Sequence, residues 1–204
     1  MVGKRRNPGL EPHNVPYVVL GAGLLWFGWF GFNAGSAAAA NASAGMAMTV
    51  THISASMGAL TWMILEWSKI SKPSVLGIAT GSIAGLAAIT PAAGYVGPFG
   101  AIVIGLLSGS LCFWGANGLK RRFGYDDSLD VFGVHGIGGA IGTIMTAFLA
   151  STAWGGFETD LNIGSLLRIQ AFGVALTAVY SGILTFLIVK LVDSTLGILY
   201  LIHI

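Results

Sequence analysis

Charged residues are scarce in this chain of 204 residues, since Lys, Arg, Asp and Glu together make up only 9% of it. A soluble domain carries about 25% of these residues, so the chain has too few of them to cover a water-facing surface. The net charge is only +2, and no basic patch is interleaved with aromatic residues, which argues against nucleic acid as a partner. The single cysteine, Cys112, rules out an intrachain disulfide.

The motifs of soluble enzymes are also missing from the sequence. It has no Walker-type phosphate-binding loop, no HExxH motif and no cluster of cysteine and histidine. The glycine-rich run from Gly133 to Gly142 lies within an apolar stretch, so we do not interpret it as a nucleotide-binding loop. We therefore predict neither an enzyme nor a bound cofactor or metal.

What the sequence has in abundance is long apolar stretches. Each is about 20 residues long, the length that a helix needs to cross a hydrocarbon core of roughly 30 Å. A chain in lipid must satisfy its own backbone hydrogen bonds, which favours helices. We predict an all-α polytopic membrane protein with six transmembrane helices. They run roughly over residues 16–37, 45–67, 73–92, 97–119, 129–150 and 168–192.

Basic residues fall almost entirely on one side of this predicted topology. Six crossings bring both ends of the chain to the same side, and only Arg168 lies on the other. The positive-inside rule then predicts a multi-pass protein of the plasma (inner) membrane with both termini of this chain in the cytoplasm. The residues on the cytoplasmic side are Lys4, Arg5, Arg6, Lys69, Lys72, Lys120, Arg121, Arg122 and Lys190.

Two histidines lie within the predicted membrane helices, where an ionisable side chain is costly and suggests a function. At about 100° per residue, Gly138, Gly139 and Gly142 lie on the same helix face as His135. These glycines could leave room for a narrow lumen beside the imidazole, or they could only allow close packing around a core histidine. The spacing leaves both interpretations open. His52 lacks such a face, and for it we predict a buried ring hydrogen-bonded to a hydroxyl.

An aromatic group and an acidic group are further candidates. Trp29, Phe32 and Ser36 lie within about 60° of one another on a helical wheel. Aromatic faces attract small cations, although an interfacial aromatic belt is the interpretation that the residues alone favour. Asp130 opens the fifth predicted helix and is expected to cap it, since carboxylates are stabilised at helix N-termini. Glu66, at the end of the second, is expected to stay solvated.

Three motifs, in this order, resemble those of the ammonium transporter (Amt/Mep/Rh) family. Gly28–Ser36 resembles the sixth membrane helix of that family, Ile89–Val96 resembles the end of the eighth, and Asp130–Gly136 resembles the tenth. The resemblance covers residues 3–197. It implies helices six to eleven of eleven, which is half of an inverted-repeat fold with the substrate path between its halves.

The resemblance also implies a division of the chain. Residues 1–15 would be the remnant of a cytoplasmic loop, and residues 16–197 would be a partial ammonium transporter membrane domain. Residues 198–204 would be an atypical C-terminal end, because they do not match the cytoplasmic tail on which the family's PII-type regulators bind. The resemblance therefore does not support regulation of that kind here.

Carried over residue by residue, the resemblance assigns roles to five positions. His135 matches the second of the family's paired pore histidines, and Phe32 matches one of the two phenylalanines that gate the outer mouth. Ser36 matches the serine of the outer ammonium site, and Trp29 fits a tryptophan near the pore. Asp130 matches an acidic residue near the cytoplasmic exit. The first pore histidine belongs to helices that are not matched here.

The function implied by the resemblance is transport of ammonium or ammonia through an apolar pore, without a cofactor. The family assembles as a homotrimer with one pore per subunit, so a second copy of the chain and the lipid bilayer are the expected partners. Two alternatives remain open. The chain could be an ammonium sensor or interaction protein, or it could be a non-functional truncated fragment.

Overall fold

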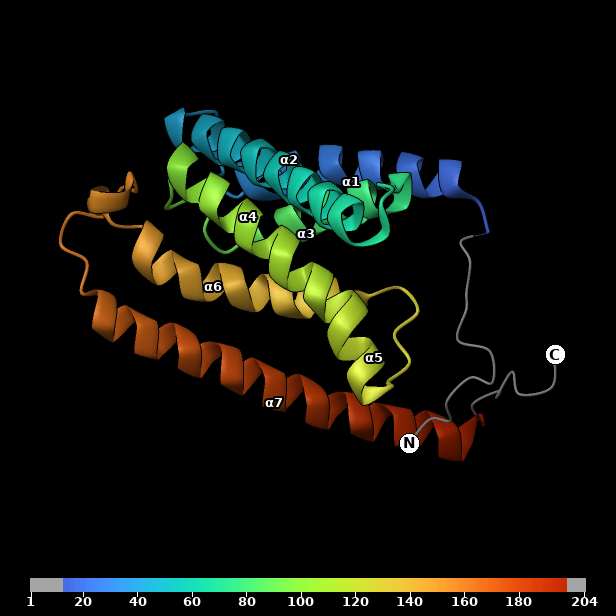
Figure 1. Ribbon diagram of the computed structural model, residues 1–204. Helices are drawn as coiled ribbons and strands as arrows, with labels where there is room; N and C mark the ends of the chain where they lie inside the picture. The colour runs from blue at the N-terminus through green and yellow to red at the C-terminus, as the bar shows by residue number, and fades with distance from the viewer. Residues whose placement is uncertain (1–12, 198–204) are drawn as a thin grey trace.

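The computed structural model describes residues 13–197, and nearly all of its regular structure there is helical (Figure 1). The only β-pairing in this part of the chain is an isolated bridge between Ser151 and Glu158. The predicted all-α class is therefore confirmed. The elements are α1 (Val15–Gly35), α2 (Ala42–Ile70), α3 (Val75–Ile89), α4 (Pro98–Trp114), η1 (Gly115–Leu119), α5 (Lys120–Phe123), η2 (Phe132–Gly136), α6 (Ile137–Leu149), η3 (Thr152–Trp154) and α7 (Ile163–Thr195).

The predicted spans correspond to six helical rods, because α4 continues through η1 into α5 and η2 continues into α6. Of the rods that the structure describes, 5 are long and apolar enough to cross a membrane. The exception is α3, whose 15 residues rise about 22 Å. Pro91 and Gly94 follow it, and the chain continues as turns through Tyr95, closed by hydrogen bonds such as Tyr95 N to Ala92 O at 2.8 Å. Ala92 and Ala93 are buried in these turns, whereas Tyr95 is exposed.

Short polar side chains begin four of these helices. The side-chain oxygens of Asn14, Asn41, Ser74 and Asn162 each accept a hydrogen bond from the backbone N–H three residues later. These bonds satisfy amide groups that have no partner inside the helix. The caps explain why helices begin at these points of an otherwise apolar sequence.

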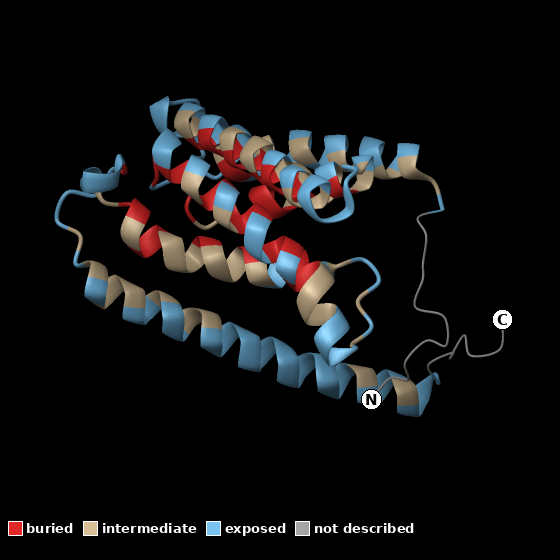
Figure 2. Cartoon of the chain, viewed as in Figure 1, coloured by how far each residue is buried: buried red, intermediate tan, exposed pale blue. Residues whose placement is uncertain are grey.

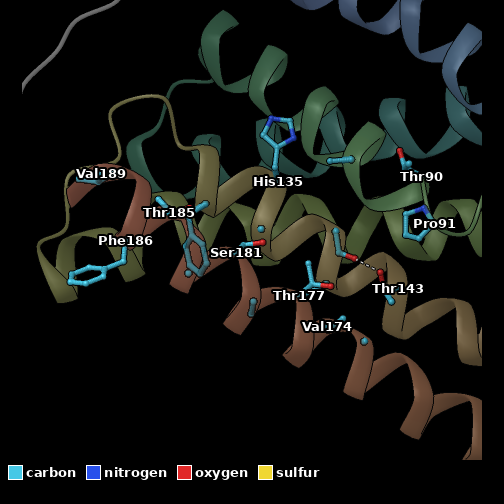
Figure 3. A pocket seen from close by; sticks show the side chains of 18 of the residues that line it. Thr90, Pro91, His135, Thr143, Val174, Thr177, Ser181, Thr185, Phe186 and Val189 are labelled. Atoms are coloured by element: carbon cyan, nitrogen blue, oxygen red, sulfur yellow. Dashed lines mark hydrogen bonds between the residues drawn. The ribbon is translucent and has the colours of Figure 1, made fainter. Parts of the chain in front are cut away.

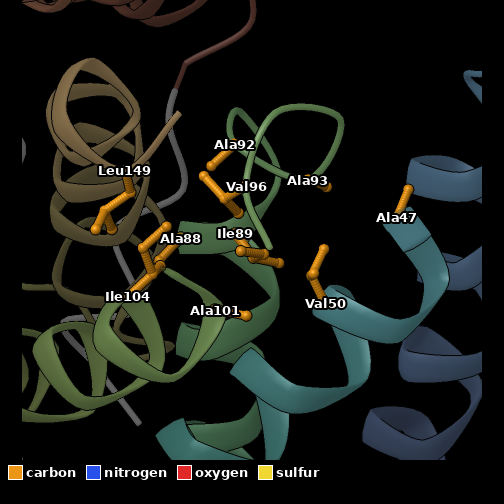
Figure 4. Close-up of a cluster of buried hydrophobic side chains, with 10 residues drawn as sticks. All are labelled: Ala47, Val50, Ala88, Ile89, Ala92, Ala93, Val96, Ala101, Ile104 and Leu149. Carbon is orange, nitrogen blue, oxygen red and sulfur yellow. The ribbon is translucent and has the colours of Figure 1, made fainter. Parts of the chain in front are cut away.

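The core lies among α2, α3 and α4, where small residues bring the helices together. A Cβ atom at Gly58 would overlap the carbonyl oxygen of Gly81, and one at Gly85 would overlap that of Ser54. Such close approach is the usual way in which helices pack in lipid. A buried apolar cluster at one end joins these helices to α6 (Figure 4). It contains Ala47, Val50, Ala88, Ile89, Ala92, Ala93, Val96, Ala101, Ile104 and Leu149.

The outermost helices α1 and α7 are largely uncovered (Figure 2). No residue of α7 is buried, and Asn33 is the only buried residue of α1. Both helices are apolar along their length, which makes contact with water costly. Their surfaces therefore need lipid or further protein around them.

Candidate functional site

His135 lies in the π-helical turn η2 rather than in a regular α-helix. A π-turn holds more residues than an α-turn, so it shifts the register of the side chains that follow it. The wheel of about 100° per residue therefore does not hold across this point. The turn is joined to the preceding loop by a 2.8 Å hydrogen bond from Val134 N to Asp130 O.

The glycines expected on the face of His135 divide into two groups. A Cβ atom at Gly142 would overlap the carbonyl oxygen of Ala88, and one at Gly138 would lie 3.5 Å from Ala84 O. Gly142 therefore serves the close packing of α6 against α3, whereas a Cβ atom at Gly138 would make only ordinary contacts. A Cβ atom at Gly139 would meet nothing within 4 Å. Close packing therefore accounts for Gly142, and open space lies beside Gly139.

Gly139 and His135 border a cavity of about 1040 Å³ between α3, α6 and α7. Figure 3 shows the imidazole at one edge of the cavity and the hydroxyl side chains of Thr177 and Ser181 on the wall that α7 forms. The hydroxyl of Thr143 donates to Gly139 O at 2.8 Å and so adds no free donor there. Among the described residues that line the cavity, the ionisable ones are His135, Lys190 and Asp193. Its walls are therefore mostly apolar.

Trp29 lies between His135 and Phe32, the second aromatic residue predicted for the site. Its indole is parallel to the imidazole within 5°, with ring centroids 6.5 Å apart. The ring of Phe32 meets the same indole edge-on, with centroids 6.4 Å apart. The indole Nε1 donates to Thr90 Oγ1 at 2.7 Å, so this tryptophan is anchored by protein. The structure thus brings Phe32, Trp29 and His135 into one row.

Ser36 follows the end of α1, one turn beyond Phe32. Its hydroxyl donates to the carbonyl oxygen of Phe32 at 2.6 Å, and the side chain is exposed. Because its proton is used in this bond, the hydroxyl oxygen presents lone pairs to a donor from outside. Phe32 itself is 61% exposed. An open aromatic face and an accepting oxygen therefore lie together at this end of α1.

The helix cap predicted for Asp130 is made by Asp127 instead. The Asp127 carboxylate accepts from the amides of Val131 and Phe132, both at 2.9 Å. Asp130 forms an ion pair with Lys120. Its φ of +53° is left-handed and turns the chain so that Asp127 reaches the amides.

Tyr125 lies in the same loop, with its ring edge-on to that of Phe132 at 6.1 Å between centroids. Its hydroxyl is buried and has no hydrogen-bond partner among residues 13–197. Burial raises the pKa of this phenol above its usual value, and the charges of Asp127 and Asp130 raise it further.

Two other expectations were wrong. His52 is exposed, and its ring lies against Trp26 and Phe30, with centroids 5.3 and 6.0 Å away. The hydroxyl of Ser56 donates to the backbone oxygen of His52 rather than to its ring. Glu66 is half-buried rather than solvated, since its carboxylate accepts from Trp62 Nε1 and from the amide and hydroxyl of Ser74. The turn after α2 folds Ser74 back onto it.

Sequence reasoning missed Thr90 and Lys120. Thr90 is 61 residues from its partner Trp29, and no local pattern pairs them. In the sequence, Lys120 stands out only as one of the basic residues that predict the orientation in the membrane. Its spacing of ten residues from Asp130, across a turn-rich loop, is a signal that could have suggested the pair.

Comparisons with known proteins agree on one family. Residues 1–202 match the family model described as Ammonium Transporter Family. The chain is 47% identical to an ammonium transporter of Aquifex aeolicus, over 97% of this chain and 47% of that protein. It is 46% identical to an ammonium transporter of Bacillus subtilis, over 95% of this chain and 49% of that protein. The chain thus spans about half the length of the curated relatives that it matches.

Solved structures resemble the fold closely. The crystal structure of Candida albicans Mep2 gives a TM-score of 0.86 at 34% identity, and the match covers 97% of this chain and 46% of that one. A structure described as a sensor Amt protein gives a TM-score of 0.85 at 29% identity, covering 96% of this chain and 49% of that one. Both similarities extend over nearly the whole of the present chain.

Proposed function

Because this chain belongs to the ammonium transporter family, we propose that it forms part of a path by which ammonium or ammonia crosses a membrane. It is a membrane protein of helices, and its residues 16–197 would be the partial transport domain. The observation that carries the proposal is the row of Phe32, Trp29 and His135, which leads from an exposed end of α1 to the edge of an apolar cavity.

The exposed end of this row would bind the cation. Phe32 and Trp29 present aromatic rings, which attract a small cation over their faces. The oxygen of Ser36 can accept a hydrogen bond from ammonium, whose N–H groups are donors. Potassium is attracted by the same rings and can be ligated by the same oxygen, so this site would collect small cations and leave the selection to the cavity.

The apolar cavity would then select against the charged form. A monovalent cation loses its hydration there at a cost of many kcal/mol unless it is neutralised. Ammonium can become neutral by giving up a proton, and potassium cannot. Ammonia would pass His135, whose two ring nitrogens can donate and accept hydrogen bonds. The proton would cross separately.

The far end of the path would be cytoplasmic, with Asp130 near the exit. This orientation is supported by the basic residues at the C-terminal ends of α2, α5 and α7, namely Lys69, Arg121, Arg122 and Lys190 among others. The chain would then lie in the plasma (inner) membrane with both of its termini inside. The uncovered apolar helices α1 and α7 are consistent with assembly into a homotrimer.

A sensor of ammonium is the second candidate, favoured by the likeness to the sensor Amt protein. A sensor needs the outer cation site but no flux through the cavity. Binding without uptake would therefore support this candidate over transport.

The test is uptake of methylammonium by a strain without its own ammonium transport, expressing the protein from its own gene. His135→Ala should lower the uptake or admit potassium, because it removes the ring at the edge of the cavity. His52→Ala is the matched control, since this histidine lies outside the cavity. If His135→Ala and His52→Ala both behave as wild type, the proposed role of His135 is wrong. Expression of residues 1–204 alone asks whether this chain suffices, and growth on low ammonium would exclude a non-functional fragment.

A further inference from the structure

Two π-helical turns lie against each other in this fold. One, η1, interrupts the rod of α4 and α5, and the other, η2, carries His135. A Cβ atom at Gly133 would lie 2.9 Å from the amide nitrogen of Ala116, and one at Gly115 would lie 3.4 Å from Gly133 Cα. No side chain fits between the two backbones. Since π-turns are rare and occur frequently at functional sites, their contact beside His135 is a specific feature.

A lysine adjoins the first π-turn and an aspartate precedes the second. Lys120 follows η1 directly, and its ammonium group forms an ion pair with the carboxylate of Asp130. The same Nζ donates to the backbone oxygen of Asp127 at 3.0 Å. Each side chain of the pair is 30% exposed, so solvent screens the pair less than it would a fully exposed one. One ammonium group therefore holds both ends of the short segment 127–130.

That segment controls the start of η2. The Asp127 carboxylate accepts from the amides of Val131 and Phe132, and the backbone oxygen of Asp130 accepts from the amide of Val134. Asp130 has a left-handed backbone, which an L-residue with a Cβ adopts only when its surroundings enforce it. The contact with Lys120 supplies part of that enforcement. A shift of Asp130 would pass through the Val134 bond to the next residue, His135.

We propose that Lys120 is a positioning residue for His135, acting through Asp130 and the π-turn η2. By fixing Asp130, it holds the imidazole against Trp29 at the edge of the cavity. The effect on transport rests on the proposed function, whereas the effect on the position of the ring does not. Without Lys120, Asp130 loses its partner and the π-turn can relax toward a regular helix, which rotates His135 away from Trp29.

The first measurement follows the ring itself. The histidines are labelled with ¹³C and ¹⁵N in the protein expressed from its own gene, and the His135 signal is assigned by its loss in His135→Ala. Lys120→Met should shift or split this signal and leave that of His52 in place. Arg121→Met is the matched control, because Arg121 is the exposed neighbour of Lys120. An unshifted His135 signal in Lys120→Met overturns the proposal, whatever the protein transports.

The second measurement is the uptake of methylammonium per amount of protein in the membrane. Lys120→Met should lower the maximal rate by about 10- to 100-fold, as misplacement of a reacting group does, with a smaller change in KM. Since Lys120 acts through His135, the same change in a His135→Ala background should cost little more. An equal fold-loss in both backgrounds, or a loss explained by less protein in the membrane, would contradict the proposal.

The charge-exchanged variant Lys120→Asp/Asp130→Lys completes the test. It should recover part of the rate and return the His135 signal toward its wild-type position, because the pair is restored. Absence of uptake by the wild-type protein, together with a moved His135 signal in Lys120→Met, would refute the proposed function and support the positioning by Lys120.

Discussion

The indole of Trp29 lies parallel to the imidazole of His135, with ring centroids 6.5 Å apart and planes 5° apart. Trp29 comes from α1 and His135 from η2, so this contact joins two rods that are distant in the sequence. The indole is fixed in turn by its hydrogen bond to Thr90, at the end of α3. The alignment of Phe32, Trp29 and His135 therefore also depends on α3, although none of these three residues belongs to that helix.

Thr90→Val should loosen this alignment. It removes the acceptor of the Trp29 Nε1 bond, at a cost of about 1–3 kcal/mol if the indole N–H stays buried. Thermal unfolding in detergent measures the loss. Thr80→Val is the control, because the hydroxyl of Thr80 bonds only to Leu76 of its own helix. Equal destabilisation by the two variants would show that the bond to Trp29 contributes nothing specific.

Gly142→Ala and Gly139→Ala should behave in opposite ways. A Cβ atom at Gly142 overlaps the backbone of Ala88, so overpacking should destabilise the protein by about 1–3 kcal/mol. Gly139→Ala adds a methyl group in open space and should leave folding intact, or stabilise α6 by about 1 kcal/mol. Because Gly139 borders the cavity, the same variant should slow methylammonium uptake. Equal yields of folded protein from both variants would contradict the predicted packing.

Ser36→Ala should weaken binding at the outer end of the row. It removes one neutral acceptor worth about 1 kcal/mol, which corresponds to a rise in KM for methylammonium of roughly fivefold. The maximal rate should change less, because the cavity is untouched. Ser110→Ala is a suitable control, since Ser110 is exposed and bonds only to Leu106 of its own helix. An unchanged KM in Ser36→Ala would remove Ser36 from the cation site.

Tyr125→Phe should be neutral or stabilising at neutral pH. It removes a buried hydroxyl that has no partner in the described part of the chain, and such a group costs about 1–3 kcal/mol when it is left unsatisfied. The measurement is the unfolding midpoint in detergent. A marked loss of stability in this variant would show that the hydroxyl has a partner after all.

The same variant should change the response to alkaline pH. Burial and the charges of Asp127 and Asp130 raise the pKa of Tyr125, so the folded protein holds the phenolic proton more tightly than the unfolded chain. Stability should therefore fall as the pH rises above about 10, where the unfolded phenol ionises. Tyr125→Phe should remove this part of the loss, and Tyr17→Phe, at an exposed position, should not.

Much of the fold could be predicted because it follows from local sequence. The apolar stretches were long enough to be recognised as helices, and Asn14, Asn41, Ser74 and Asn162 cap four of them. The site was harder to predict. The wheel gave a correct grouping of Trp29 with Phe32, which share a regular helix, but failed beside His135, where a π-turn shifts the register. The environments predicted for His52 and Glu66 were wrong because neighbouring segments, and not their own helix faces, decide them.

The sequence by itself determined that this chain is a helical membrane protein, which of its residues are apolar enough to span lipid, and which family it belongs to. Those properties are set by composition, by length and by motifs that are continuous in the chain. Only the tertiary structure decided that Thr90 anchors Trp29, that Asp127 rather than Asp130 caps η2, and that Lys120 holds Asp130. A π-turn and a left-handed aspartate are unfavourable locally, so they form only where packing between helices and a charge from another segment offset their cost.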